Sequence, residues 1–424
     1  MCNTACPVYS VYPRYPGPKR LGPELERMRL EGVSADTPWV EYCLGCHRCD
    51  LACPNQVKVS EMIARAKAEH RKPFTRALRD WWFARPGLLG RLTTIAPAVS
   101  NFALSLKPMR WLMSRFMQVT PERRFPAYAK PNLRTRNFSR GANSRVLFFP
   151  GCFIRYNKPD LGRSAIRLLE LSGLSVEVAS SSCCGVPAIA NGEADLAQSL
   201  ARANVRSLAR KVESGMRVVT ACSSCGYMFK TGFGGVLDED DSLSAGAELE
   251  QFAKWCRPGI HWYPTHFRKK RGNGWGTEAY SKRQTALIAA NTFDIAEILM
   301  EQADAGKLDL PFQQTNLRLA YHAPCHQRSQ GIGRPWFHLL GRIPGVVIED
   351  LDAGCCGMSG TYGFKQEKYE VSMTIGQELF DSIRALQPHR VATECATCQM
   401  QIEHGTNVRA IHPIEVMLQA CEGE

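Results

Sequence analysis

Between residues 146 and 424, short apolar runs alternate with longer stretches that carry a helical pattern. The runs are rich in β-branched and aromatic residues, whereas stretches such as 160–171 and 193–212 have the length of helices. Strands that alternate with helices indicate α/β domains with parallel sheets. The predicted strands are Val146–Phe149, Val176–Val178, Val218–Val219, Leu317–Tyr321, Val346–Ile348 and Val391–Ala392.

Residues 75–145 show a different pattern, an apolar stripe with helical spacing that is interrupted at Pro108. Because proline ends or kinks a helix, we expect two short helices here, each with one apolar face. Arg110 and Arg115 are expected on the polar face of the second helix. The stripe consists of Val99, Phe102, Ala103 and Leu106, and then of Met109, Leu112, Met113 and Phe116.

The net charge of +13 is concentrated in the same segment, where fourteen Lys or Arg stand against two acidic residues. Amphipathic helices with basic and aromatic residues lie flat in a bilayer interface, and each basic residue near anionic lipid contributes ~1 kcal/mol. We therefore expect this segment to contact a membrane surface; the alternative is packing on the other domains or on a partner protein. The predicted membrane-binding residues are Phe102, Leu106, Trp111, Leu112, Phe116, Arg110 and Arg115, with Trp81 and Trp82 at headgroup level.

Other partners and compartments are disfavoured. A nucleic-acid partner is not expected, because no recognisable fold with stacking aromatics accompanies the charge. A spanning helix needs ~20 apolar residues, whereas the two longest uncharged runs have 15 residues and each contains a proline. The N-terminal residues lack the apolar core of a signal peptide. Eighteen cysteines then indicate a reducing compartment, where cysteines act as ligands or redox groups.

Residues 43–54 carry the clearest chemical motif, Cys-Leu-Gly-Cys-His-Arg-Cys-Asp-Leu-Ala-Cys-Pro. This is the C-x2-C-x2-C-x3-C-P run of bacterial ferredoxins, in which three cysteines bind one [4Fe-4S] cubane and the fourth binds another. Zinc sites, the alternative, usually show two separated C-x2-C pairs. We interpret His47, inside the loop, as a hydrogen-bonding residue that tunes the cluster rather than as a ligand.

Residues 2–7, Cys-Asn-Thr-Ala-Cys-Pro, match the second half of the same motif. Because the fourth cysteine of each motif binds the other cluster, Cys6 should complete the first cubane. A second cubane would have Cys53 and Cys2 and would lack two ligands, so we expect the sequence to start late. The predicted ligands of the complete cubane are Cys6, Cys43, Cys46 and Cys49.

Ten further cysteines form an internal repeat, in which five positions recur at offsets of 172 or 173 residues. Each group follows a predicted strand, and ligands gather at the carboxyl ends of parallel strands, so five thiols should converge in each copy. Gly185 and Gly357, after the paired cysteines, should adopt positive φ or allow close backbone approach. We interpret each set as a redox cluster; structural zinc or buried thiols are the alternatives. The two sets are Cys152, Cys183, Cys184, Cys222 and Cys225, and Cys325, Cys355, Cys356, Cys395 and Cys398.

The motif Cys-Cys-Gly-Val-Pro at 183–187, with the repeat Cys-Cys-Gly at 355–357, resembles the cysteine-rich (CCG) domains in the B subunit of heterodisulfide reductase. A ferredoxin block in front of two such domains resembles the iron–sulfur subunits of glycolate oxidase, of lactate-utilisation proteins and of anaerobic glycerol-3-phosphate dehydrogenase. Residues 15–23, Tyr-Pro-Gly-Pro-Lys-Arg-Leu-Gly-Pro, favour the last of these. The resemblance covers nearly the whole chain.

The resemblance implies an electron carrier between flavoprotein dehydrogenase subunits and membrane quinone, peripheral at the cytoplasmic face of the inner membrane. Its cofactors would be [4Fe-4S] clusters, one of them complete, and up to two CCG-type clusters. Alternatives are a disulfide reductase with catalytic CCG clusters, and a relay that serves glycolate or lactate. The chain contains no dinucleotide fingerprint or P-loop, so flavin would reside on other subunits.

The expected architecture is a mainly helical ferredoxin-type domain followed by two repeated α/β CCG domains with parallel sheets. His322 and His326 flank Cys325, and one of them could tune or ligate the second CCG cluster. Cys256 and Cys421 belong to no motif and are expected to be plain thiols. The predicted segments are a ferredoxin-type domain at 1–74, a basic connector at 75–145, CCG domains at 146–237 and 284–424, and an inserted linker at 238–283.

Overall fold

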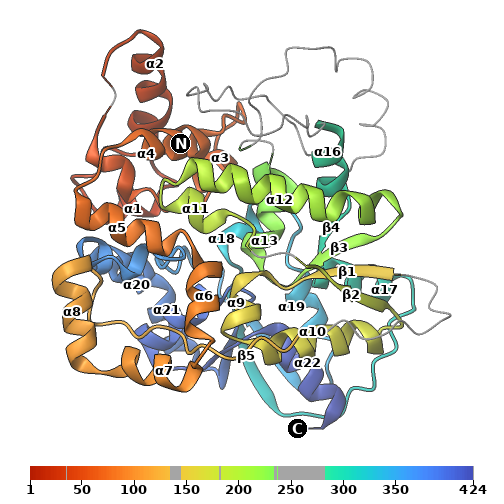
Figure 1. Ribbon diagram of the computed structural model, residues 1–424. Helices are drawn as coiled ribbons and strands as arrows, with labels where there is room; N and C mark the ends of the chain where they lie inside the picture. Colours follow the sequence, from red (N-terminus) through yellow and green to blue (C-terminus); the bar gives the residue numbers. More distant parts are fainter. Residues whose placement is uncertain (35, 134–144, 181–182, 234–235, 237–281, 424) are drawn as a thin grey trace.

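The computed structural model describes residues 1–424 apart from 35, 134–144, 181–182, 234–235, 237–281 and 424. In the described part, two four-stranded parallel sheets have the same topology, β2-β1-β3-β4 and β6-β5-β7-β8 (Figure 1). The α/β class and its duplication are therefore confirmed. The strands are β1 (Arg145–Phe149), β2 (Ser175–Val178), β3 (Arg217–Thr220), β4 (Thr292–Asp294), β5 (Leu317–Tyr321), β6 (Val346–Asp350), β7 (Arg390–Ala392) and β8 (Ala410–Ile411).

The two sheets repeat each other down to single hydrogen bonds. The N–H of Ala179 donates to the carbonyl of Phe148 at 2.8 Å, and the N–H of Leu351 donates to the carbonyl of Tyr321 at 3.0 Å. All six predicted strands are present, whereas the short strands β4 and β8 at the sheet edges were not predicted. Each sheet thus brings three strands with cysteines at their carboxyl ends next to one another.

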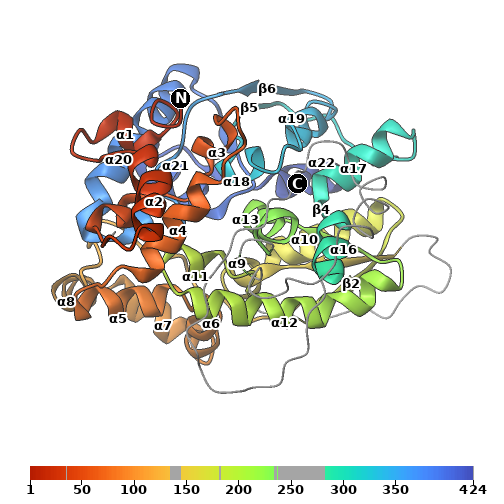
Figure 2. The ribbon, with the colours of Figure 1, turned by 90° about the horizontal axis from the view of Figure 1, so that it is seen from above.

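Helices of one α/β unit pack on helices of the other, and the unit pair shares one apolar core. Helix α10 contacts α22, and α17 contacts α19, so each unit covers part of its partner's surface (Figures 1 and 2). The helices are α9 (Gly151–Tyr156), α10 (Pro159–Leu171), α11 (Val186–Ala190), α12 (Ala194–Glu213), α13 (Ser223–Tyr227), α16 (Lys282–Ala290), α17 (Ile295–Asp304), α18 (Cys325–Arg328), α19 (Pro335–Leu340), α20 (Tyr369–Leu386), α21 (Ala396–Thr406) and α22 (Pro413–Glu422).

One predicted domain boundary needs correction. Strand β4 pairs with β3 in the first sheet, with Val218 opposite Thr292, although it follows residues 237–281 in the chain. Residues 292–304, with β4 and α17, therefore complete the first unit, and the predicted start of the second domain at residue 284 is too early. The predicted linker falls almost entirely outside the described residues.

The N-terminal region is built from short helices around a small core of its own, which also includes Cys355, Tyr362 and Ile375 of the second CCG unit. A turn of π-helix (Arg20–Glu24) and a 3-10 turn (Pro38–Tyr42) complete this region. The ferredoxin-type domain therefore lies directly against the second CCG unit. Its α-helices are α1 (Pro7–Val11), α2 (Leu25–Leu30), α3 (Arg48–Leu51) and α4 (Val59–Glu69).

The connector forms four helices along one side of the molecule, drawn in orange in Figure 1. The break at Pro108 is confirmed, because α7 ends at Ser105 and α8 begins at Lys107. Among the described residues, no helix is both long and apolar enough to pass through a bilayer. The helices are α5 (Phe74–Phe83), α6 (Pro86–Thr93), α7 (Pro97–Ser105) and α8 (Lys107–Met117).

Candidate iron–sulfur sites

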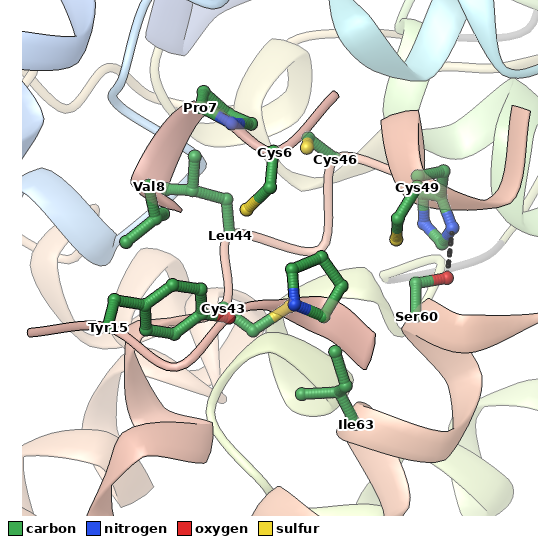
Figure 3. A pocket seen from close by; sticks show the side chains of 12 residues that line it. Cys6, Pro7, Val8, Tyr15, Cys43, Leu44, Cys46, Cys49, Ser60 and Ile63 are labelled. Carbon is green, nitrogen blue, oxygen red and sulfur yellow. Dashed lines mark hydrogen bonds between the residues drawn. The ribbon is translucent and has the colours of Figure 1, made fainter. Parts of the chain in front are cut away.

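Four cysteines of the N-terminal region line one pocket, and Figure 3 shows them around a common space. Cys6 caps α1, Cys43 follows the 3-10 turn, and Cys46 and Cys49 lie on the loop that leads into α3. The rest of the wall is mostly apolar and includes Val8, Tyr15, Leu44 and Ile63. The structure thus brings together the four residues that the ferredoxin motif predicts for one cubane.

The loop between Cys43 and Cys49 turns tightly because two of its residues have left-handed backbone conformations, Gly45 (φ 64°) and His47 (φ 60°). The N–H of Gly45 points at the sulfur of Cys43, at 3.4 Å. Burial raises the pKa of the Cys6 thiol to about 11 and that of Cys49 further. Such thiols ionise only beside a strong positive charge, which fits a site for iron.

Cys2 and Cys53 do not line this pocket, and both are only partly buried. Their proposed role as ligands of a second, incomplete cubane therefore stays a prediction. Cys421 is buried in the core that the two CCG units share, away from every cysteine set. Cys256 lies outside the described residues.

The five cysteines of the first repeat come together at the ends of β1, β2 and β3. Their side chains interact in a chain from Cys152 to Cys183, Cys184, Cys225 and Cys222. The hydrogen bond from Cys183 lowers the pKa of the Cys184 thiol to about 6. Five sulfurs without a disulfide among them are the donor set of a cluster with more than one metal ion.

The second repeat reproduces this arrangement with Cys325, Cys355, Cys356, Cys398 and Cys395. The sulfurs of Cys356 and Cys398 lie 3.1 Å apart. Hydrogen bonding from Cys398 lowers the pKa of the Cys395 thiol to about 6. Each repeat therefore offers one compact set of five sulfur donors, as the strand-end argument predicts.

A glycine follows each cysteine pair for a steric reason. Gly185 has φ 104° and Gly357 has φ 84°, which confirms the predicted positive φ. At Gly357 a Cβ atom would lie only 2.1 Å from the carbonyl oxygen of Ser372. The backbone of α20 thus closes over the second cysteine pair.

Replacing Gly357 by alanine is expected to disrupt the second CCG site. The left-handed conformation costs a non-glycine residue ~1–2 kcal/mol, and the clash with Ser372 adds to this cost. The midpoint of urea unfolding and the iron content should both fall. Gly360→Ala is the matched control, because Gly360 also has positive φ but a Cβ there would meet nothing within 4 Å. Equal effects of the two substitutions would contradict the steric explanation.

Three aromatic side chains join the cysteine-bearing loops. The Nε2 atom of His326 lies 3.1 Å from the carbonyl oxygen of Gly45, and its Nδ1 atom lies 2.8 Å from the hydroxyl of Ser224. Tyr227 stacks on His326 at 5.1 Å and contacts His47 at 4.2 Å. We call His47, Tyr227 and His326 the loop junction. Tyr227 was not predicted, since no motif marks it out.

His47 is held by hydrogen bonds, as expected for a residue that tunes a cluster. Its Nδ1 atom lies 2.7 Å from the hydroxyl of Ser60 and 3.2 Å from that of Tyr227. His322, in contrast, is 2 % exposed, and burial lowers its pKa to about 4, so its imidazole is neutral at pH 7.

The predicted membrane-binding residues fall on two faces. Phe102, Leu106, Trp111, Leu112 and Phe116 are all exposed, and Arg115 is exposed beside Phe116. Arg110 is only partly exposed and donates to the carbonyl of Pro121 at 3.0 Å. Met113 of the predicted stripe packs on the second CCG unit. The stripe is therefore split between an inner and an outer side.

The connector is also less basic at its surface than its composition indicates. Arg79 is fully buried against Asp80 and Glu367, and Arg123 is buried against the carbonyl of Gly363. Arg85 pairs with Glu193 at 3.0 Å. These arginines fix the connector to the CCG units, so they are not available to lipid.

The fold and its four-cysteine and five-cysteine sites define an iron–sulfur electron-transfer protein with a ferredoxin-type domain and two CCG domains. Family models match accordingly: a 4Fe-4S dicluster domain at residues 1–57, and a cysteine-rich (CCG) domain at residues 146–230 and 319–403. Iron–sulfur clusters are therefore its cofactors, rather than single zinc ions.

Comparison with curated proteins narrows this class. The chain is 34% identical to the C subunit of anaerobic glycerol-3-phosphate dehydrogenase from Escherichia coli, over 99% of this chain and 96% of the relative. It is 23% identical to the glycolate oxidase iron–sulfur subunit of E. coli, over 100% and 93%. The B subunit of fumarate reductase (CoM/CoB) from Methanothermobacter marburgensis is 28% identical over 65% of this chain and 45% of its own. The chain belongs to the family formed by the C subunits of anaerobic glycerol-3-phosphate dehydrogenase.

Proposed function

We propose that this chain carries electrons from a flavin-containing glycerol-3-phosphate dehydrogenase to quinone at the cytoplasmic face of the inner membrane. Oxidation of the alcohol releases two electrons and two protons, and reduction of the quinone to quinol takes up both. The clusters supply one-electron steps between these two-electron reactions. Family membership across the whole length of the relative supports this choice of donor.

The loop junction is the observation that carries the relay. Through Gly45 it reaches the loop of the cubane pocket, through Ser224 the Cys222–Cys225 loop, and through His326 the residue next to Cys325. Cys355 is also close enough to Cys46 to influence the ionisation of its thiol. The three complete cysteine sets therefore adjoin one another, as a chain of electron carriers requires.

The direct test combines the anaerobically purified chain with its flavoprotein partners, glycerol 3-phosphate and a soluble quinone. Quinone reduction should require this chain, and glycolate or lactate should not replace glycerol 3-phosphate. Quinone reduction at an unchanged rate without the chain would exclude the relay.

The rival function is disulfide reduction at a CCG cluster, which the family relationship to heterodisulfide-type proteins suggests. In that case the isolated chain, reduced by viologen, would reduce disulfides. We expect no such activity, because the sequence match to the E. coli glycerol-3-phosphate dehydrogenase protein extends over the ferredoxin-type domain and both CCG domains together.

The surface of α5–α8 supports the membrane contact. Most of the large apolar side chains that the described residues expose lie in this segment, including Phe102 at 66%, Trp111 at 63% and Phe116 at 59%. Burial of one such side chain contributes ~1.5–3 kcal/mol. With Arg91, Lys107 and Arg115 exposed on the same helices, this surface suits an anionic bilayer.

Replacing Phe102, Trp111 and Phe116 together by serine should release the protein from anionic liposomes in a flotation assay. The matched control replaces Leu30 and Val347, which are equally exposed but lie outside the connector, and it should leave binding unchanged. Retained binding of the triple variant would mean that these helices face a partner protein instead.

A further inference from the structure

The two CCG sites differ at one position next to their sulfurs. Aligned through Cys152 and Cys325, Phe149 at the end of β1 corresponds to His322 just after β5. Phe149 is fully buried and packs edge-on against Phe229 at 4.6 Å. The first site thus has an apolar wall where the second has an imidazole.

His322 is placed as a metal ligand would be. A ring nitrogen of His322 and the sulfurs of Cys356 and Cys398 all lie within 4.8 Å of one another. The backbone N–H of His322 donates to the carbonyl of Ala392 at 3.0 Å, which fixes the residue at the carboxyl end of the sheet. Three donor atoms of this kind can share one ion.

An ordinary buried histidine would have its polar atoms hydrogen-bonded to the protein. The Nδ1 atom of His322 is buried and has no hydrogen-bond partner, although the side chain is 2 % exposed. His326, on the other side of Cys325, has a partner for each ring nitrogen. The imidazole of His322 therefore has an unused donor atom beside the sulfurs.

We propose that His322 is a sixth protein ligand of the second CCG cluster and binds the same iron as Cys356 and Cys398. The first CCG cluster then has cysteine ligands alone. This assignment rests on the presence of the second CCG cluster, not on the identity of the electron donor.

A neutral imidazole donates less negative charge to iron than a thiolate, and histidine in place of cysteine raises the reduction potential of iron–sulfur centres. The second CCG cluster, which adjoins the cubane pocket, is therefore the stronger electron acceptor of the two. The histidine makes two clusters of the same cysteine pattern inequivalent.

The test uses the full chain, purified anaerobically with ¹⁵N-labelled histidine, and pulsed EPR on its CCG clusters. A nitrogen coupling of the size found for iron-bound imidazole is expected in the unsubstituted protein. It should vanish in His322→Phe, which copies the first site, and persist in His326→Gln. A missing coupling in the unsubstituted protein, or its persistence in His322→Phe, would overturn the assignment.

The reciprocal exchange gives a second readout that does not depend on activity. In redox titrations followed by EPR, His322→Phe should lower the potential of the second CCG cluster. Phe149→His should add a nitrogen coupling to the first CCG cluster and raise its potential. Unchanged potentials in both variants would contradict a ligand at this position, provided that iron content shows both clusters to be present.

Discussion

Replacement of Cys46 by serine is expected to remove the complete cubane cluster and with it the transfer of electrons to quinone. Cys46 lines the pocket with Cys6, Cys43 and Cys49, so its loss leaves three sulfurs for four irons. A serine hydroxyl is a poor replacement, because iron–sulfur clusters select soft thiolate ligands. Iron should fall by about four atoms per chain, the content of one [4Fe-4S] cluster.

The control for this prediction is Cys421→Ser. Cys421 is a buried cysteine on α22 that belongs to no cysteine set, so its replacement should leave the iron content and the EPR spectrum unchanged. The CCG signals should also survive in Cys46→Ser, because their ten cysteines are intact. Full iron content in Cys46→Ser would show that the cubane is assembled from other ligands.

The cysteine spacing predicted the sites well because ligands of one cluster must lie within a few ångströms of one another. A repeat at offsets of 172 or 173 residues therefore implies the same strands and the same strand ends in both copies. The edge strands β4 and β8 were missed for a local reason. They have three and two residues, too few to show a periodic pattern, and β4 is separated from β3 by a long insertion.

Side-chain partners far apart in the sequence could not be predicted. Tyr227 and His326 meet only because α13 and α18 pack together between the units. Arg79 counts as surface charge in the composition, yet its carboxylate partner Glu367 is 288 residues away. Charge density alone overestimated how basic the connector surface is, since composition does not say which arginines are paired inside.

Replacement of Arg79 by methionine should strongly destabilise the whole protein. Arg79 is fully buried and donates to both carboxylate oxygens of Glu367 at 2.9 Å, and to Asp80 at 3.0 Å. A further bond joins it to the carbonyl of Gln118 at 3.0 Å. Removing one partner of a buried ion pair costs ~3–5 kcal/mol, because the remaining charges stay buried without compensation. The midpoint of urea unfolding should fall accordingly.

Exposed arginine on the same connector provides the control. Arg91→Met should change the free energy of unfolding by less than ~0.5 kcal/mol, since exposed charges contribute little. Both variants should be compared at equal iron content, because bound clusters also stabilise the fold. If Arg79→Met unfolds at the same urea concentration as Arg91→Met, the ion pairs of Arg79 do not hold the connector in place.

The pH dependence should reveal the same network. Burial alone would raise the pKa of Asp80, but Lys365, Arg79 and Lys72 outweigh it and lower the pKa to about 2. A carboxylate with a lowered pKa in the folded state stabilises the protein above its unfolded value of ~3.9, and this contribution is lost as the pH falls towards 2. Without Arg79 the pKa of Asp80 should rise, so acid unfolding of Arg79→Met should begin at a higher pH. An unshifted acid transition would mean that Lys365 and Lys72 alone keep Asp80 ionised.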